Sequence, residues 1–204
     1  MKKQMTREFV IFDIETTGLF PRRGDRIIEI GAVLMRDGII EKEFSSLVNT
    51  KRRITKAAKW VHGITNEDLQ NAPHPEEVFS DFNEFIKGST LISHNATFDV
   101  SFLRYELQRH RLFLNNRAIC TLELSRRRFP DLTNHKLHTV HRHLFQDKAI
   151  EQRHRALDDA RMVAEIWMAM EGIGLQARYK KGRSFIDEQI ITTVLGKNKH
   201  VKRF

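Results

Sequence analysis

The chain has 204 residues, of which 40% are hydrophobic and 30% are charged. This length and composition suit one globular domain with its own core, and they exclude a disordered or fibrous chain. The formal net charge of +9 favours anionic partners, nucleic acid first, because Lys and Arg bind phosphates and release counterions. Residues 178–204 hold eight basic and two acidic side chains, so this last segment carries +6 of the net charge.

The sequence also bears on where the protein works. No apolar run is long enough to span a membrane, and residues 1–4 are not followed by the apolar segment of a secretion signal. Cys120 is the only cysteine, which excludes an internal disulfide and a cysteine-based zinc site within one chain. We therefore expect a cytoplasmic protein without a membrane partner.

Hydrophobic patterning predicts strands and helices in alternation. Residues 8–15 begin as a continuous apolar run, typical of a buried strand, and then alternate. Residues 26–35 and 39–48 flank an Asp-Gly pair, which predicts an antiparallel hairpin. This pattern predicts an α/β fold with a mixed sheet flanked by helices. Further along the chain we expect short strands at 91–94 and 118–121, and helices that contain Phe82, Phe102, Val140 and Val163, the last ended by Gly172.

Two acids stand at the end of the first predicted strand. Strand alternation places Asp13 and Glu15 on the same face. Two carboxylates there repel each other and lose solvation unless a cation lies between them, and hard divalent metals are suitable cations. The alternative is a strand end that emerges into water with solvated acids.

Two further acids follow at other strand and helix junctions. Asp99 lies where a short strand turns into a helix, a common place for sites in open α/β sheets. Taken alone, however, its position favours a carboxylate that satisfies the backbone N–H groups and dipole of the helix N-terminus. His154 and Asp159 are five residues apart, or about 140° around a helix, so they converge only if His154 precedes the helix.

Taken together, three strings form a recognisable pattern. D-I-E-T-T-G at 13–18, H-N-A-T-F-D at 94–99 and H-R-A-L-D-D at 154–159 resemble the motifs of the DEDDh, or DnaQ-like, 3′-to-5′ exonucleases, a family that includes proofreading subunits of bacterial DNA polymerases. V-H-G-I-T at 61–65 also resembles a segment of that family. The resemblance covers residues 7–172 and implies a single exonuclease domain with a ribonuclease H-like fold. Residues 173–204 form a basic C-terminal extension outside it.

The resemblance implies a role for each motif residue. Asp13, Glu15, Asp99 and Asp159 would hold two Mg²⁺ or Mn²⁺ ions, and His154 would act as general base. Asp158 is the rival to Asp159, but neighbouring helix residues point about 100° apart and the family spacing selects Asp159. Phe102 reads equally well as a core residue. The residues implied to line the 3′-terminal nucleotide are Thr16, Thr17, Gly18, Leu19, His62 and Phe102.

Two segments remain outside the resemblance or its motifs. The crowded histidines favour an exposed, histidine-bearing helix over a metal site, because Leu137, Val140 and Leu144 supply an apolar stripe between them. Residues 184–195 combine helical spacing with β-branched residues, so we expect them to pack on the body or on a partner while the basic residues of 197–203 reach phosphate. The histidines in question are His135, His138, His141 and His143.

These features predict a metal-dependent exonuclease that shortens single-stranded or frayed DNA from the 3′ end. RNA is the alternative substrate, since nothing in the sequence shows how a 2′-hydroxyl would be received. A non-catalytic nucleic-acid-binding adaptor is the alternative of another class, although a binder has no need of clustered acids facing phosphate. No clamp-binding peptide follows Gly172, so a repair role is expected as readily as proofreading beside a polymerase.

Overall fold

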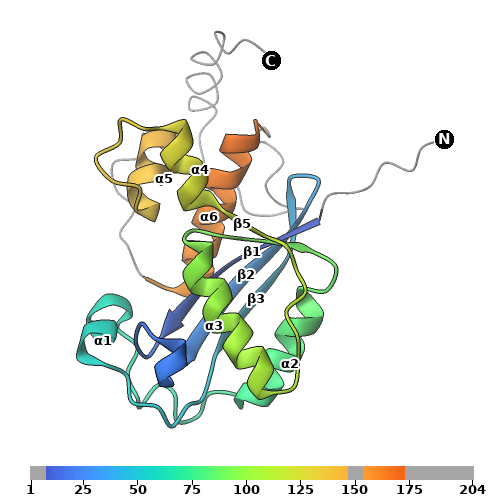
Figure 1. Ribbon diagram of the computed structural model, residues 1–204, viewed down its shortest axis with the longest axis vertical. Helices are drawn as coiled ribbons and strands as arrows, with labels where there is room; N and C mark the ends of the chain where they lie inside the picture. The colour runs from blue at the N-terminus through green and yellow to red at the C-terminus, as the bar shows by residue number, and fades with distance from the viewer. Residues whose placement is uncertain (1–7, 147–153, 173–204) are drawn as a thin grey trace, which may run out of the picture.

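A five-stranded mixed sheet forms the centre of the computed structural model, which describes residues 8–146 and 154–172 (Figure 1). The strand order is β3-β2-β1-β4-β5. The first three strands are antiparallel neighbours, and the last two run parallel to β1, so the predicted α/β class with a mixed sheet is confirmed. The strands are β1 (Glu8–Thr16), β2 (Ile27–Arg36), β3 (Ile39–Leu47), β4 (Thr90–Ser93) and β5 (Ala118–Cys120).

Helices cover both faces of this sheet. In Figure 1, α2 and α3 lie on one face, and α6 crosses the other. Within the described ranges, no helix is long and apolar enough to cross a membrane. The predicted basic extension, residues 173–204, lies outside the described residues. The helical segments are η1 (Pro21–Arg23), α1 (Lys56–His62), α2 (Pro75–Phe85), α3 (Ala96–Arg109), α4 (Thr121–Arg128), α5 (Leu137–Phe145) and α6 (Ala156–Glu171).

The hairpin between β2 and β3 forms as the Asp-Gly pair predicts. Asp37 and Gly38 have φ angles of 52° and 83°, the left-handed region that a two-residue hairpin turn requires. The turn places Arg36 opposite Ile39, and the ladder continues to Glu29 opposite Leu47. On its other side, β2 pairs with β1 along the whole length of both strands.

The core has two layers because β1 and β2 are covered on both faces. Val10, Phe12 and Ile14 pack toward α2 and α3, whereas Ile11 packs with Val33 toward α6. Alternate residues of one strand therefore enter different layers, and both sets must be apolar. This explains the continuous hydrophobic run that begins β1.

Two helices were not predicted, and both lack a strong apolar stripe. Helix α1 is short and is held at its ends by local chemistry, since the Thr55 hydroxyl accepts a hydrogen bond from the Ala58 N–H at 3.2 Å and Gly63 is left-handed with φ 73°. Helix α4 ends in three exposed arginines. Such helices depend on caps and contacts more than on periodicity.

The histidine-bearing segment departs from its prediction. His141 is buried, and its Nε2 lies 2.7 Å from Oε2 of Glu165 on α6. The prediction of an exposed histidine helix is therefore wrong for His141, because α5 packs this side of its surface against α6. Among the described residues, the metal-compatible group of acids and histidines lies elsewhere and includes none of these four histidines.

Candidate active site

Four carboxylates from three elements meet at one edge of the sheet. Asp13 and Glu15 lie on the last part of β1, and Asp99 lies in the first turn of α3, directly after β4. Because β1 and β4 are parallel, their carboxyl ends reach the same edge. Asp159 comes from the first turn of α6, which crosses the other side of β1 and β2. Residues far apart in sequence thus form one acidic cluster.

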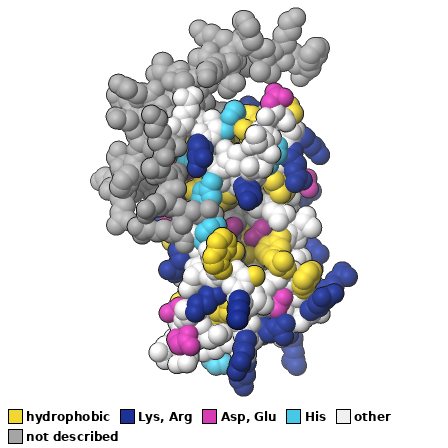
Figure 2. All heavy atoms as spheres, turned by 90° about the vertical axis from the view of Figure 1, so that its left-hand side faces the viewer, with side chains coloured by type: hydrophobic (Ala, Val, Ile, Leu, Met, Phe, Trp, Pro, Cys, Tyr) yellow, Lys and Arg dark blue, Asp and Glu magenta, His cyan; other side chains and the backbone are white. Residues whose placement is uncertain are grey.

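The cluster is largely withdrawn from solvent. Glu15, Asp99 and Asp159 are 8%, 3% and 7% exposed, and Asp13 is partly exposed. Figure 2 shows acidic side chains in a hollow near the middle of this face, with hydrophobic side chains on either side and Lys and Arg farther out. Buried carboxylates cost free energy unless they are paired with cations or protonated.

The electrostatics of the cluster reflect this burial. Burial, followed by the charges of neighbouring acids, raises the pKa of Asp13 well above its ordinary value and that of Glu15 to about 9. Burial also raises the pKa of Asp99 to about 7 and that of Asp159 to about 6. The Ser93 hydroxyl donates to Asp99 Oδ2 at 2.5 Å and lowers the pKa of Asp99 in part. These carboxylates can all be ionised near pH 7 only beside a cation.

The donor set fits a hard divalent ion. Oxygen atoms of Glu15 and Asp159 and a ring nitrogen of His154 all lie within 4.8 Å of one another. In addition to burial, the charges of Asp99, Asp159 and Glu15 raise the pKa of Asp13, so Asp13 and Asp99 belong to the same cluster. A site built mainly of carboxylate oxygens favours Mg²⁺ or Mn²⁺ over softer metals.

His154 lies in the segment immediately before α6, which is the condition for its convergence with Asp159. Its φ angle is 40°, so the backbone turns there before the helix begins at Ala156. Burial lowers the pKa of His154 below its ordinary value. The imidazole is therefore neutral near pH 7, with a nitrogen able to accept a proton.

The two neighbouring acids of α6 have different surroundings. Asp159 is buried in the cluster, whereas the Asp158 side chain is 51% exposed and accepts a hydrogen bond from Arg161 Nη1 at 3.0 Å. Adjacent helix residues point about 100° apart, so only one of the two can face the sheet edge. The structure turns Asp159 to the cluster and Asp158 to solvent.

An anchor for the start of α6 was not found from the sequence. Glu29 on β2 is 2% exposed and accepts hydrogen bonds from Arg155 Nε and Nη2 at 2.8 and 2.7 Å and from the Ala156 N–H at 3.2 Å. Two residues along β2, Gly31 leaves room for the helix start, since a Cβ there would lie 2.1 Å from the Leu157 backbone nitrogen. The sequence did hold a signal for this anchor, namely a glutamate within the apolar run of β2.

The segment expected to line the nucleotide divides into exposed and internal parts. Leu19 is 67% exposed and can meet a ligand directly. The Thr16 hydroxyl donates to the Gly18 carbonyl at 2.6 Å, and the Thr17 hydroxyl accepts from the Arg26 N–H at 3.0 Å. The side chains of Thr16 and Thr17 therefore shape this turn from within.

His62 and Phe102 lie deeper than a nucleotide contact requires. The Ile64 N–H donates to His62 Nδ1 at 3.0 Å, so Nε2 carries the proton and faces the Thr16 carbonyl at 3.3 Å. His62 thus joins α1 to the end of β1. Phe102 is 0% exposed and packs against Phe98 in the core, which leaves it no surface for a nucleotide and favours the core alternative.

Comparison with protein-family models identifies the family of this chain. The model of the RNase T group, described as "Exonuclease", matches residues 10–167 and so includes the sheet except for the first two residues of β1, the acidic cluster and most of α6. The chain belongs to the DEDDh exonuclease family. The resemblance expected from its motifs is confirmed, and an exonuclease is the class of enzyme to which this chain is assigned.

Two curated relatives of this exonuclease-family chain are polymerase proteins. The epsilon subunit of DNA polymerase III from Rickettsia felis is 36% identical over 195 residues, which cover 93% of this chain and 82% of that subunit. A PolC-type DNA polymerase III from Caldanaerobacter subterraneus subsp. tengcongensis is 43% identical over 163 residues, which cover 80% of this chain. The matched region is 11% of that polymerase, so the chain spans about one tenth of its length.

Solved exonuclease structures share the fold. Exonuclease X in complex with 5′ overhanging duplex DNA is 27% identical, with a TM-score of 0.63 and coverage of 91% of this chain and 99% of that one. The nuclease domain of 3′hExo, a DEDDh member bound to rAMP, has a TM-score of 0.68 at 22% identity and covers 88% of this chain and 99% of that one. The predicted ribonuclease H-like architecture is confirmed.

Proposed function

We propose that the chain is a divalent-metal-dependent 3′-to-5′ exonuclease that removes 5′-mononucleotides from single-stranded or frayed DNA ends. The observation that carries this proposal is the convergence of His154 and four carboxylates, three of them buried and Asp13 partly exposed, at one sheet edge. The relatives named as DNA polymerase III epsilon and PolC support DNA as the substrate and a polymerase as partner, in proofreading or in repair. A role beside such a polymerase belongs in the cytoplasm.

Asp13, Glu15, Asp99 and Asp159 are the residues that would hold two Mg²⁺ or Mn²⁺ ions. Their shared burial and raised pKa values support this assignment, because a cation relieves the repulsion that otherwise favours protonation. When bound, such ions lower the pKa of a water molecule and stabilise negative charge on the phosphoryl and leaving oxygens.

The remaining chemistry falls to the side chains around the cluster. His154 accepts the proton of the attacking water at an imidazole nitrogen, since its lowered pKa keeps the ring neutral. The water oxygen forms a bond to phosphorus while the bond from phosphorus to the 3′ oxygen breaks. The products are a 5′-mononucleotide and a strand with a new 3′-hydroxyl. Leu19 meets the terminal nucleotide, and Arg155 with Glu29 holds His154 beside the acids.

An adaptor without catalysis fits these residues poorly. Four clustered carboxylates repel the phosphates of a bound strand when no metal is present. A protein that only binds nucleic acid would be weakened by such a cluster, whereas a metal-dependent hydrolase requires it. The proposed function therefore explains why the acids lie buried together.

A gel assay with a matched pair of variants tests the proposal. The substrates are 5′-labelled single-stranded DNA and RNA of the same sequence, each with Mg²⁺, Mn²⁺ or EDTA. We expect a metal-dependent ladder that shortens from the 3′ end, lost in Asp159→Asn and retained in Asp158→Asn. Cleavage of RNA alone would reassign the substrate, and binding without cleavage of either strand would support the adaptor.

The basic segment 173–204 is proposed to add affinity for phosphates. Its eight basic residues after position 177 carry much of the net charge. Truncation after Gly172 should weaken binding to DNA and flatten its dependence on salt more than it slows hydrolysis. Equal salt slopes for both forms would exclude this role.

A further inference from the structure

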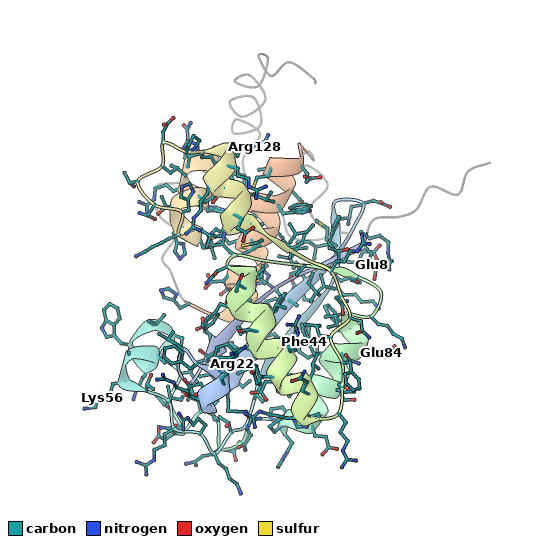
Figure 3. The ribbon with its side chains drawn as sticks, viewed as in Figure 1. Glu8, Arg22, Phe44, Lys56, Glu84 and Arg128 are labelled. Atoms are coloured by element: carbon teal, nitrogen blue, oxygen red, sulfur yellow. The ribbon has the colours of Figure 1, made fainter. Side chains whose placement is uncertain are left out.

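A basic and aromatic pocket lies between η1 and α3, outside the acidic cluster. Its volume is about 450 Å³, and its lining has no carboxylate. In Figure 3, Arg22 on η1 lies next to α3, which forms the other wall. The side chains that give the pocket its character are Phe20, Arg22, Arg23, Arg104, Tyr105 and Gln108.

The three arginines of this pocket lack the buried carboxylate partners that hold several other arginines. Arg26, Arg52 and Arg155 each contact a buried carboxylate, of Glu106, Asp25 and Glu29 respectively. Arg22, Arg23 and Arg104 are exposed and form no ion pair within residues 8–146 and 154–172. Three like charges around one cavity repel each other unless an anion binds between them. The pocket is therefore suited to phosphate.

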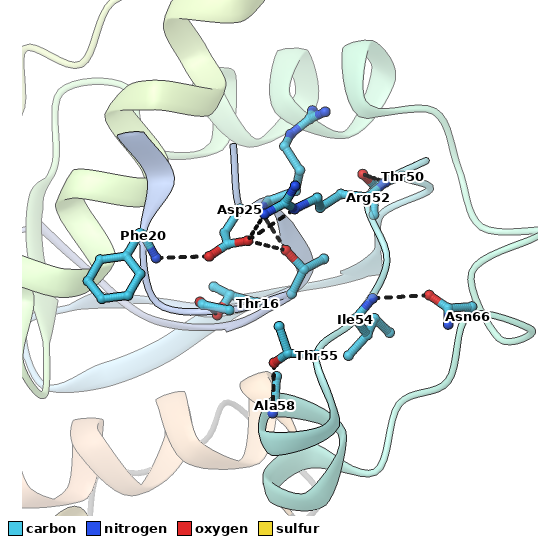
Figure 4. Close-up of polar contacts among 12 residues, drawn as sticks. Thr16, Phe20, Asp25, Thr50, Arg52, Ile54, Thr55, Ala58 and Asn66 are labelled. Atoms are coloured by element: carbon cyan, nitrogen blue, oxygen red, sulfur yellow. Dashed lines mark hydrogen bonds and ion pairs between the residues drawn. The ribbon is translucent and has the colours of Figure 1, made fainter. Parts of the chain in front are cut away.

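The loop that carries two of these arginines is held in one shape. Asp25 is buried and accepts hydrogen bonds from the Phe20 N–H at 3.0 Å and from Arg52 Nη2 at 3.0 Å, as Figure 4 shows. A Cβ on Gly18 would lie 2.5 Å from the Asp25 carboxylate, so the turn closes tightly on this side chain. The Arg23 guanidinium stacks 4.8 Å from the centroid of the Phe20 ring. A loop that already has one shape can present Phe20 to a ligand without the entropy cost of ordering the loop on binding.

The pocket and the acidic cluster share two elements. Phe20 follows Thr16, the last residue of β1, by four positions, so one segment leads from the acids to the pocket. Helix α3 carries Asp99 in its first turn and Arg104 five residues later, which is about 7.5 Å along the helix axis. Five residues also turn about 140° around the helix, so a strand that reaches both would pass from the face of α3 that carries Asp99 to the face that carries Arg104.

We propose that this pocket binds the substrate strand a few nucleotides on the 5′ side of the nucleotide being removed. Arg22, Arg23 and Arg104 would contact its phosphates, and Phe20 and Tyr105 would receive a base by stacking. This inference rests on the proposed function, because it assumes that the 3′ end occupies the acidic cluster. It adds the path of the substrate strand and a second binding site, through which longer strands would bind more tightly.

Binding to strands of different length tests the pocket. Fluorescence anisotropy with 5′-labelled single-stranded DNA would compare a dinucleotide with a decanucleotide, in Ca²⁺ and in a range of salt. The variants are the double substitution Arg22→Ala with Arg104→Ala, and Phe20→Ala. Arg127→Ala on α4 is the charge-matched control, because this arginine is equally exposed but does not line the pocket. Thermal unfolding of each variant checks that it folds.

The expected loss of affinity grows with strand length. Each pocket variant should bind the decanucleotide about tenfold more weakly and the dinucleotide within about twofold of the unaltered chain. The double arginine variant should also reduce the salt slope by about 1.4, since each phosphate contact in a single strand contributes about 0.7. Equal losses for both lengths, or a loss as large in Arg127→Ala, would overturn the proposal.

A second substrate separates this inference from the function on which it rests. Duplex DNA with a recessed 5′ end offers a complementary strand that could enter the pocket instead. A defect confined to this duplex, with normal binding of the single-stranded decanucleotide, would overturn the assignment to the substrate strand. Failure of the unaltered chain to shorten the decanucleotide with Mg²⁺ or Mn²⁺ would refute the proposed function, whatever the binding results.

Discussion

Gly31→Ala offers a sharp test of how the fold places the acids. Gly31 lies on β2 directly opposite Asp13, and a Cβ at this position would lie 2.1 Å from the Leu157 nitrogen and 2.3 Å from the Ala156 carbonyl carbon. Both neighbours are backbone atoms, so no side chain can rotate away. Ordinary contact begins at 3.4 Å, which requires the start of α6 to move by about 1.3 Å.

This displacement sets the expected magnitude. The start of α6 carries His154 on its approach and Asp159 in its first turn, so both would shift relative to Glu15. A misplacement of about 1 Å lowers the rate of a positioned reaction by roughly 100-fold. Overpacking of this kind costs about 1–3 kcal/mol of stability. We therefore expect a large fall in kcat together with a modest fall in Tm.

The assay measures nucleotide release with Mg²⁺, Mn²⁺ affinity by titration calorimetry, and Tm. Gly88→Ala is the matched control, because Gly88 has a φ angle of 77° and open space around it, so alanine there is strained without a clash. Gly88 also precedes β4, at the end of that strand opposite to the acids. If Gly31→Ala retained normal kcat and metal affinity, or if Gly88→Ala lost as much activity at equal Tm, the reasoning would fail.

Three further predictions concern the cluster and its anchor. In EDTA, Tm should fall as the pH rises from about 5 to about 9. The raised pKa values of Glu15, Asp99 and Asp159 mean that the folded state holds protons more tightly than the unfolded state. Saturating Mg²⁺ should reduce this fall, and a Tm independent of pH would contradict the prediction. His154→Ala should lose most of the activity, and with it the rise in rate as the imidazole deprotonates, while Mn²⁺ still binds; an unchanged rate would remove His154 from the mechanism. Arg155→Ala should lower the free energy of unfolding by about 1–3 kcal/mol and slow hydrolysis, because the buried Glu29 carboxylate then loses its Arg155 partner. The control Arg161→Ala removes a bridge from α6 to Glu43, a carboxylate that is much more exposed than Glu29, and should cost under about 1 kcal/mol. Similar losses of activity in both variants would refute the anchor.

Local patterns were enough to predict most elements and to propose the members of the site. The Asp-Gly turn, the two-sided apolar run of β1 and the glycine after α6 depend on neighbours in sequence. The motif strings identified the acids and His154 because their order and spacing resemble those of one family. Helix α1 escaped prediction because its cap and a left-handed glycine, more than periodicity, set its bounds.

Long-range packing decided what the residue order left open. Glu29 and Arg155 are 126 positions apart, and the burial of His141 against Glu165 depends on how α5 meets α6. The sequence by itself determined most of the elements, the family and the acids proposed to act together, since turn chemistry, alternation and motif spacing are local. Only the tertiary structure decided that Asp159 faces the cluster, that Phe102 lies in the core and that three exposed arginines surround one pocket, because side-chain surroundings depend on which distant elements pack together.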